Sequence, residues 1–251
     1  MKTFTLTSSL LFSVVATGCM IGDGSNETDE DVIGGSIDNG DPSVVAVFAH
    51  AAGATSGSLC TGSVISSTTV LTAAHCVDPT AVGANQVYDV WTGPVFGQGT
   101  RLSVASVAWD TAFDINNPVA GHDIAIVKLA QPTTLAPLPF GQSTGSGSVR
   151  IVGFGMNTHV VNPYIPSGAG QKRQARTNID SATATQITIG NTGVQTCHGD
   201  SGGPAFQTIN GRETIVGVVS YGEDLSSTLV CVQGGTDTRV GAYMAFINAH
   251  L

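Results

Sequence analysis

The chain has few charged residues for its length, and very few that are basic. Only 11% of its 251 residues are charged, nine are Lys or Arg, and the formal net charge at pH 7 is −9. Binding to nucleic-acid phosphates requires a surface rich in Lys and Arg, so this composition argues against a nucleic-acid partner. The one basic run, Lys172-Arg173-Gln-Ala-Arg176, is expected to form a solvated surface loop.

Long apolar runs are also scarce. The stretch from Phe4 to Val15 is apolar, but it is shorter than the about 20 residues that a membrane-spanning helix needs. It follows Lys2 and precedes three small residues at 16–18, which is the pattern of a cleaved signal peptide over residues 1–18. The sequence therefore predicts a secreted protein.

The five cysteines show no Cys-x-x-Cys spacing, and no His-x-x-x-His pair accompanies them, so neither a metal nor a cofactor is expected. In an exported chain Cys60, Cys76, Cys197 and Cys231 permit three disulfide pairings. The fifth, Cys19, directly follows the small-residue triplet and resembles a bacterial lipoprotein cleavage site. The alternatives are a lipid anchor at the cell envelope, which is the only membrane association expected, or an ordinary signal peptide. The lipoprotein-like site and compact loops favour a bacterial source.

Three short motifs carry side chains suited to nucleophilic catalysis. They are Cys-His-Gly-Asp-Ser-Gly-Gly-Pro at 197–204, Thr-Ala-Ala-His-Cys at 72–76, and His-Asp before an apolar run at 122–129. A serine hydroxyl is a weak nucleophile until an imidazole takes its proton, and a buried carboxylate orients that imidazole. Ser201, His75 and Asp123 are therefore the candidate nucleophile, base and orienting acid.

The serine motif also offers donors for an oxyanion. The carbonyl oxygen under attack becomes negative and needs aimed N–H groups, which Gly199 and Ser201 can supply. Taken singly, each motif has a plain structural interpretation as a turn, a packed histidine or the start of a strand. The order His75, Asp123, Ser201 argues against an esterase of the α/β-hydrolase type, in which the serine comes first and the histidine last.

Residues 32–251 resemble a peptidase of the trypsin and chymotrypsin family. The matching segments, in family order, are Val32-Ile-Gly-Gly35, Cys60-Thr-Gly-Ser-Val-Ile-Ser66, Leu71-Thr-Ala-Ala-His-Cys76, Gly153-Phe-Gly155, Val219-Ser-Tyr-Gly222 and Thr238-Arg-Val-Gly-Ala-Tyr-Met-Ala-Phe-Ile247. The resemblance implies a secreted serine endopeptidase that hydrolyses peptide bonds through an acyl-enzyme on Ser201, with His75 as general base and acid.

The same resemblance implies an all-β, chymotrypsin-like fold of two antiparallel six-stranded β-barrels and a C-terminal helix. The first barrel would span about residues 32–135, the second about 136–240, and the helix 240–250. Short apolar segments between turn residues agree with an all-β chain. The expected strands are 43–49, 64–71, 87–92, 124–129, 149–154, 186–189, 215–221 and 229–232.

Residues 19–31 form an acidic segment that is interpreted as a propeptide of a zymogen. The resemblance implies that its removal frees an amine on Val32, which turns inward and pairs with Asp200. Because a buried charge needs a partner, this pair would fix the backbone that carries the oxyanion donors. Asp31 precedes Val32, so a trypsin is not the expected activating enzyme.

The residue at the base of the family's primary pocket is Gln195, where trypsins have an aspartate. Gly222 and Gly235 match the glycines of the pocket wall, and Ser220 would help to hold the substrate backbone. The sequence therefore leaves undecided which substrate side chain the primary pocket prefers.

Asp237 stands close to the pocket floor, where a tyrosine is usual in the family. It could supply the missing negative charge from another direction. The alternative is an aspartate at a surface bend, turned toward Thr236 or Arg239.

The resemblance further implies the disulfides Cys60–Cys76 and Cys197–Cys231. It implies a monomer that acts on protein or peptide substrates, with a protein inhibitor as a candidate partner. A catalytically silent member used for binding is the alternative function class, but such homologues usually lack a triad residue.

Overall fold

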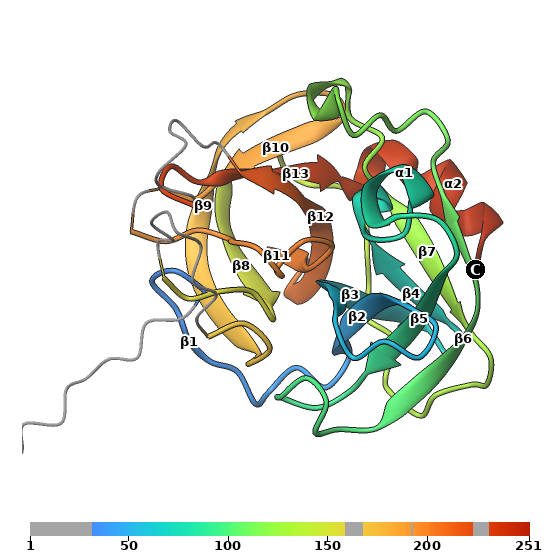
Figure 1. Ribbon diagram of the computed structural model, residues 1–251. Coiled ribbons are helices and arrows are strands. Elements are labelled where there is room, and N and C mark those ends of the chain that lie inside the picture. Colours follow the sequence, from blue (N-terminus) through green and yellow to red (C-terminus); the bar gives the residue numbers. More distant parts are fainter. Residues whose placement is uncertain (1–31, 159–167, 192, 223–230) are drawn as a thin grey trace, which may run out of the picture.

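The computed structural model describes residues 32–158, 168–191, 193–222 and 231–251. Two β-barrels stand side by side, and short helices lie outside them (Figure 1). The predicted signal peptide, the propeptide and Cys19 lie outside the described residues. Among the residues that are described, no helix has both the length and the apolar character needed to cross a bilayer.

The first barrel is closed by six antiparallel strands in the order β2-β3-β4-β7-β6-β5. Their bounds are β2 (Val44–Ala51), β3 (Gly57–Ser66), β4 (Thr69–Thr72), β5 (Gln86–Trp91), β6 (Arg101–Trp109) and β7 (Ala125–Leu129). Branched apolar side chains such as Val64, Leu71 and Ile126 are fully buried in it, as expected for strands that turn one face into a barrel.

The second barrel has the order β9-β10-β13-β12-β11-β8 and is closed by pairing of β8 with β9, while β1 adds to the outer side of β9. Its bounds are β1 (Ser36–Ile37), β8 (Gly147–Gly153), β9 (Arg173–Ala182), β10 (Gln186–Ile189), β11 (Pro204–Ile209), β12 (Arg212–Gly222) and β13 (Gly235–Arg239). The two six-stranded antiparallel barrels confirm the fold class expected from the sequence.

Short helical segments connect or end the barrels. They are η1 (Ala74–Cys76), α1 (Pro79–Val82), η2 (Pro118–Ala120), η3 (Val240–Tyr243) and α2 (Met244–Ala249). The expected helix at 240–250 therefore begins as a 3₁₀ turn and continues as one short α-helix. Its apolar face, with Val240, Tyr243 and Ile247, is buried against the core that the first barrel shares with this end of the chain.

Five strands of the structure are absent from the sequence prediction: β1, β6, β9, β11 and β13. The expected strand 64–71 is in fact the end of β3, a turn and β4. The expected strand 229–232 begins outside the described residues, and neither Cys231 nor Val232 is in a strand.

The expected surface loop at the basic run is wrong. Arg173 begins β9, and Lys172 and Arg173 are only 2% and 7% exposed. Along β9 the buried positions alternate with exposed ones, but the inward side chains include Ala175 and Thr177, which are small or polar. The alternation was therefore hidden from an analysis based on large apolar residues.

Candidate active site

His75 and Asp123 form a closely paired unit in the first barrel. His75 lies in η1, directly after β4, and Asp123 lies two residues before β7, which pairs with β4. The imidazole Nδ1 lies 2.7 Å from Asp123 Oδ2, and the backbone N–H of His75 donates to Oδ1 at 2.9 Å. Two contacts from one carboxylate fix both the position and the tilt of the ring.

The two side chains shift each other's pKa in the direction that favours an ion pair. Burial works to lower the pKa of His75, but the negative charge and hydrogen bond of Asp123 outweigh it and hold this pKa above its usual value. Burial works to raise the pKa of Asp123, but the charge of His75, with hydrogen bonds from His75 and Ser220, holds it below its usual value. The pair therefore keeps a carboxylate beside the ring.

The second barrel completes the surroundings of Asp123. The hydroxyl of Ser220, in β12, donates to Asp123 Oδ2 at 2.5 Å. Thr238, in β13, donates to the backbone carbonyl of Asp123 at 2.8 Å. Because these donors belong to the other barrel, the carboxylate is held at the junction of the two barrels.

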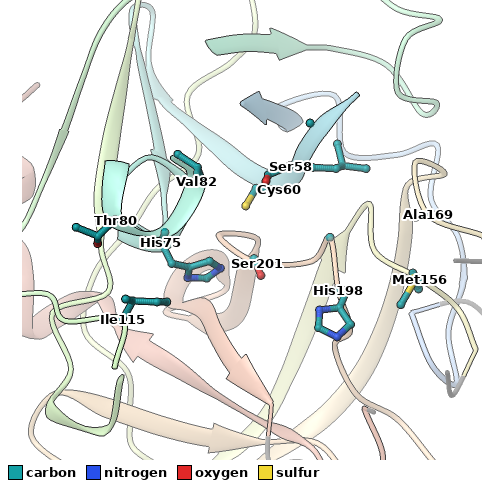
Figure 2. Close-up of a pocket in the computed structure, with 14 residues that line it drawn as sticks. Ser58, Cys60, His75, Thr80, Val82, Ile115, Met156, Ala169, His198 and Ser201 are labelled. Atoms are coloured by element: carbon teal, nitrogen blue, oxygen red, sulfur yellow. The ribbon is translucent and has the colours of Figure 1, made fainter. Parts of the chain in front are cut away.

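Ser201 lies in the loop between β10 and β11, across the barrel junction from His75. Both residues line a cavity of about 500 Å³ and a second one of about 370 Å³. Figure 2 shows the larger cavity, with Val82 and Ile115 on the side of His75 and with Met156 and His198 on the other side. The structure thus brings the three sequence-predicted triad residues to one cleft.

The backbone donors next to Ser201 are uncommitted. No described residue accepts a hydrogen bond from the N–H of Gly199 or of Ser201. Gly199 has φ = +102°, and a Cβ built on it would lie 2.9 Å from the Cα of Gly155. This turn therefore requires glycine, and it leaves two N–H groups beside the cavity that both residues line.

Asp200, between the two donors, is turned into the protein. It is 1% exposed and accepts hydrogen bonds from the N–H of Cys197 at 2.9 Å and of Gly155 at 2.8 Å. Burial raises its pKa to about 6 despite these two donors. Val32 is also buried, and Ile33 pairs with Gln195 in an antiparallel bridge.

The smaller cavity is bounded by β12 and by the loop before Ser201. Thr196, Val219, Ser220, Tyr221 and Gly222 are among the residues that line it.

Gln195 does not line this cavity. Its side-chain amide instead donates to the carbonyl of Cys231 and accepts from the N–H of Gly234. A Cβ built on Gly235 would lie 3.2 Å from the hydroxyl of Thr196, which places this glycine at the same wall.

Asp237 is fully buried in β13, so its interpretation as part of a surface bend is wrong. It stands opposite Val219, a residue of the cavity wall, and residues directly opposite in an antiparallel pair share a face of the sheet. Neither carboxyl oxygen has a hydrogen-bond partner among the described residues, and burial raises its pKa to about 8. Asp237 is therefore next to Val219 of the cavity wall, although it does not line the cavity itself.

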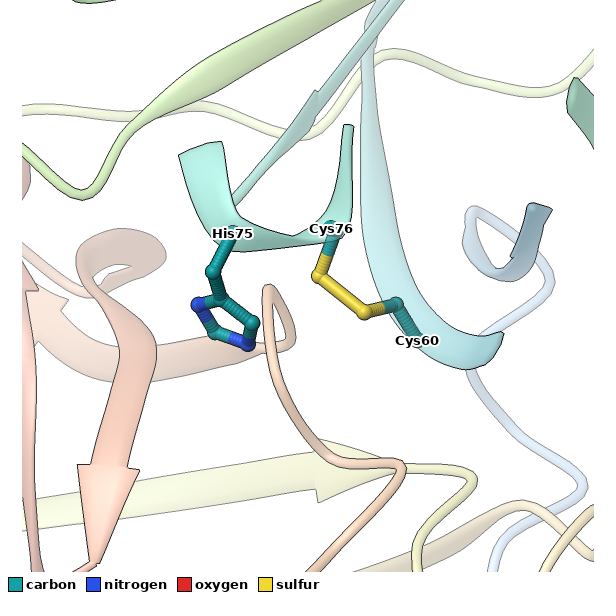
Figure 3. Close-up of side chains that lie close together, drawn as sticks. All are labelled: Cys60, His75 and Cys76. Atoms are coloured by element: carbon teal, nitrogen blue, oxygen red, sulfur yellow. A yellow bond between two sulfur atoms is a disulfide. The ribbon is translucent and has the colours of Figure 1, made fainter. Parts of the chain in front are cut away.

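The structure contains both implied disulfides, Cys60–Cys76 and Cys197–Cys231. Figure 3 shows the first beside His75. Cys60, His75 and Cys76 place potential metal-ligand atoms within 4.8 Å of one another. Metals bind thiolates, however, and both sulfurs are joined in a disulfide, so the group fits a brace for η1 better than a metal centre.

Two residues of this site escaped the sequence analysis, Thr61 and Thr238. The hydroxyl of Thr61 donates to the carbonyl of Gly199 and accepts from the N–H of Phe154. Threonine is common in strands, and no local signal separates these two from the others.

Comparisons with known proteins agree with this geometry. The family model described as Trypsin matches residues 37–247. Chymotrypsin-like elastase family member 1 of Bos taurus is 30% identical over 241 residues, covering 88% of this chain and 90% of that protein. Its namesake in Rattus norvegicus is 30% identical over 207 residues, covering 75% and 77%.

The Homo sapiens protein of this name is 28% identical over 241 residues, covering 88% of this chain and 93% of that protein. The chain therefore belongs to the trypsin family. It is a serine-type endopeptidase, and its substrates are proteins or peptides. These relatives are mammalian, so they lend no support to the bacterial source that the leader favours.

Proposed function

We propose that the chain is a secreted endopeptidase made as a zymogen, with Ser201 as nucleophile, His75 as general base and acid, and Asp123 as the group that orients His75. The observation that carries this proposal is the 2.7 Å contact between His75 and Asp123 beside a cavity that Ser201 also lines. No other described pair of histidine and carboxylate shares a cavity with a serine between two uncommitted N–H groups.

The reaction would proceed in two halves. Ser201 Oγ attacks the substrate carbonyl carbon while its proton passes to His75 Nε2, and the N–H groups of Gly199 and Ser201 receive the oxyanion. The amine of the broken peptide bond leaves with the proton from His75. Water then attacks the acyl-enzyme by the same route, with His75 first taking its proton and then returning one to Ser201.

Activation would follow removal of residues up to 31. The new amine of Val32 would pair with Asp200, whose carboxylate accepts two backbone N–H bonds and whose pKa is raised by burial although the charge of Arg173 works to lower it. A positive charge at that point offsets the burial of the carboxylate. The pair would hold the turn at Gly199 in the shape that presents both donors.

The cavity of about 370 Å³ would take the substrate side chain that precedes the scissile bond. Ser220 and Gly222 would carry the substrate backbone, while Gln195 and Gly235 would shape the pocket base. When Asp237 is ionised, its negative charge, next to Val219 of the wall, would attract a positively charged substrate side chain into this pocket. A cation in the pocket favours that ionisation, so preference for Arg or Lys should grow as the pH rises.

The test is digestion of a diverse peptide library by protein that begins at Val32, read by mass spectrometry at pH 7 and pH 9, with Ser201→Ala as control. Cleavage that is absent from the control supports the proposed roles. No cleavage by the Val32 form would contradict them and favour a silent binding protein. Cleavage after Arg or Lys that is unchanged in Asp237→Asn would exclude the role of Asp237.

Export and assembly have separate tests. Mass spectrometry of the membrane fraction would show a lipidated Cys19 peptide if the chain is anchored, and its absence would leave a freely secreted enzyme. We propose a monomer, which gel filtration of the Val32 form tests directly. Trapping of an added protein inhibitor by wild-type enzyme but not by Ser201→Ala would show that an inhibitor uses the same cleft.

A further inference from the structure

Lys172 is a lysine buried at the start of the second barrel. It is 2% exposed, and its ammonium donates to the carbonyl oxygens of Asp41 and, at 3.2 Å, of Val44. The ammonium also lies 5.8 Å from the centre of the Phe154 ring. Removing an ammonium from water is costly unless it is well partnered. Asp41 belongs to the segment that joins Val32 to the first barrel, and Val44 is the first residue of β2 in that barrel.

Asp38 is the second buried charge of this segment. It is 1% exposed, its Oδ1 accepts from the N–H of Gly40 at 2.8 Å, and its Oδ2 has no hydrogen-bond partner among the described residues. Its backbone N–H donates to the carbonyl of Lys172 at 2.9 Å. Burial and the neighbouring carboxyl of Asp41 raise the pKa of Asp38, and the charge of Lys172 opposes this rise. The two groups therefore support each other inside the protein.

A neighbouring ion pair fastens the same segment. The guanidinium of Arg150, in β8, donates two hydrogen bonds to the carboxylate of Asp41, at 2.5 and 3.1 Å. It also donates to the carboxylate of Glu213. Segment 36–41 is thus tied to the surface of the second barrel by two cations, one from β8 and one from the start of β9. Pairing of β1 with Arg173 and Gln174 adds backbone contacts.

In protein cleaved before Val32, residues 32–35 form a short arm that extends from segment 36–41 toward the serine loop. Val32 is buried, and the carbonyl of Ile33 accepts from the N–H of Gln195 at 3.0 Å. A short arm held at its base loses less conformational freedom when its tip is fixed than a long free arm does. The position of Val32 near the serine loop therefore depends on how firmly the base is held.

We propose that Lys172 and Asp38 are positioning residues for catalysis, because the pair anchors the arm that presents the freed amine of Val32 to Asp200. This inference rests on the activation proposed above. Weakening the anchor shifts molecules toward a form with the arm withdrawn and the oxyanion turn unformed. Substrate binding by the remaining active molecules is unaffected.

The experiment uses protein cleaved before Val32 and compares wild type with Lys172→Met and Asp38→Asn. We expect each variant to move the loss of kcat at alkaline pH about one unit lower, so that kcat measured above the wild-type midpoint falls about tenfold while KM changes little. The reason is that a tenfold weaker arm releases its amine, and so lets it deprotonate, at a lower pH. The double variant should lose little more than either single one.

Lys128→Met is the matched control, because the ammonium of Lys128 likewise donates to two oxygens of the protein, the hydroxyl of Thr69 and the carbonyl of His250, but in the first barrel. It should leave the pH profile unchanged. Lysine variants that lower the melting temperature without moving the pH profile or the kcat would overturn the proposal. Asp38→Asn, which keeps the side-chain shape, decides the matter if Lys172→Met fails to fold.

Labelling of the Val32 amine with an amine-reactive reagent separates this inference from the one on which it rests. A wild-type amine that is protected, together with faster labelling of Asp38→Asn, supports the anchor. A protected wild-type amine with equal protection in the variants refutes the anchor alone. A wild-type amine that labels freely in active enzyme refutes the proposed activation itself.

Discussion

The hydroxyl of Thr61, in the first barrel, donates a hydrogen bond of 2.8 Å to the carbonyl of Gly199, in the serine loop of the second. The backbone N–H of Thr61 donates to the carbonyl of Ser201, also at 2.8 Å. One residue of β3 thus holds both ends of the tripeptide that carries the two uncommitted N–H groups. The shape of the proposed oxyanion site is set by contact between the barrels as well as by the local turn.

Replacing Thr61 by valine tests this contact. The change leaves the carbonyl of Gly199 and the N–H of Phe154 without their partner, and an unmet buried polar group costs about 1–3 kcal/mol. We expect kcat to fall about tenfold or more and the melting temperature to drop. Thr208→Val, at an exposed position of β11, should change neither. Normal kcat in Thr61→Val would show that the loop keeps its shape unaided.

Replacing Asp123 by asparagine should change both the rate and the pH profile. His75 must be neutral to accept a proton, so activity is lost as the pH falls through its pKa, which Asp123 holds above the usual value. Without that charge the acid limb should move to lower pH, while kcat/KM falls about 10³–10⁴-fold. Asp110→Asn, which alters the 2.8 Å pair with His122, should leave the limb in place. An unmoved limb in Asp123→Asn would contradict the pairing.

The burial of Asp237 makes stability depend on pH. Its pKa is about 8 in the folded protein, well above the usual value of a carboxyl, so folding favours the protonated form. The penalty is absent below about pH 4, where both states are protonated, and grows as the pH rises toward 8 by about 1.4 kcal/mol per unit.

Asp237→Asn should therefore be more stable than wild type at pH 8, by several kcal/mol at most, and nearly equal to it at pH 4. Denaturant melts at both values measure this difference. Asp180→Asn, at an exposed position of β9, should show no such trend. If the stability difference between Asp237→Asn and wild type does not grow with pH, the folded protein in solution must hold Asp237 as a carboxylate beside a partner that stabilises its charge.

The two disulfides should differ in what their loss does to kinetics. Cys197–Cys231 spans 34 residues and both its cysteines line the smaller cavity, so Cys197→Ser/Cys231→Ser should raise KM and cost about 3–4 kcal/mol of stability. Cys60–Cys76 spans 16 residues beside His75, so its removal should cost about 3 kcal/mol and lower kcat. Equal effects on KM from both double variants would refute this division.

Much of the site could be predicted from residues close together in the sequence. The turn around Ser201 and the segment 72–76 with His75 are short motifs whose chemistry follows from single side chains, and Asp123 stands just before an apolar run. Gln195 and Asp237 could be identified from the sequence only because they differ from the residues usual in the family. Their surroundings depend on β12, β13 and the loop at 231–234, which are far apart in the sequence.

What the sequence by itself determined is therefore the chemistry: a nucleophile, a base, an acid, two disulfide pairs by resemblance, and an all-β chain. The tertiary structure alone decided which polar groups are buried. Lys172 is polar in sequence yet lies inside, because backbone carbonyls of a distant segment replace its water. Asp237 lies inside because Gly217 leaves room for its carboxyl, whose Oδ2 would be 2.7 Å from a Cβ there. Burial is a property of how strands close into a barrel, and closure joins residues whose separation along the chain carries no local signal.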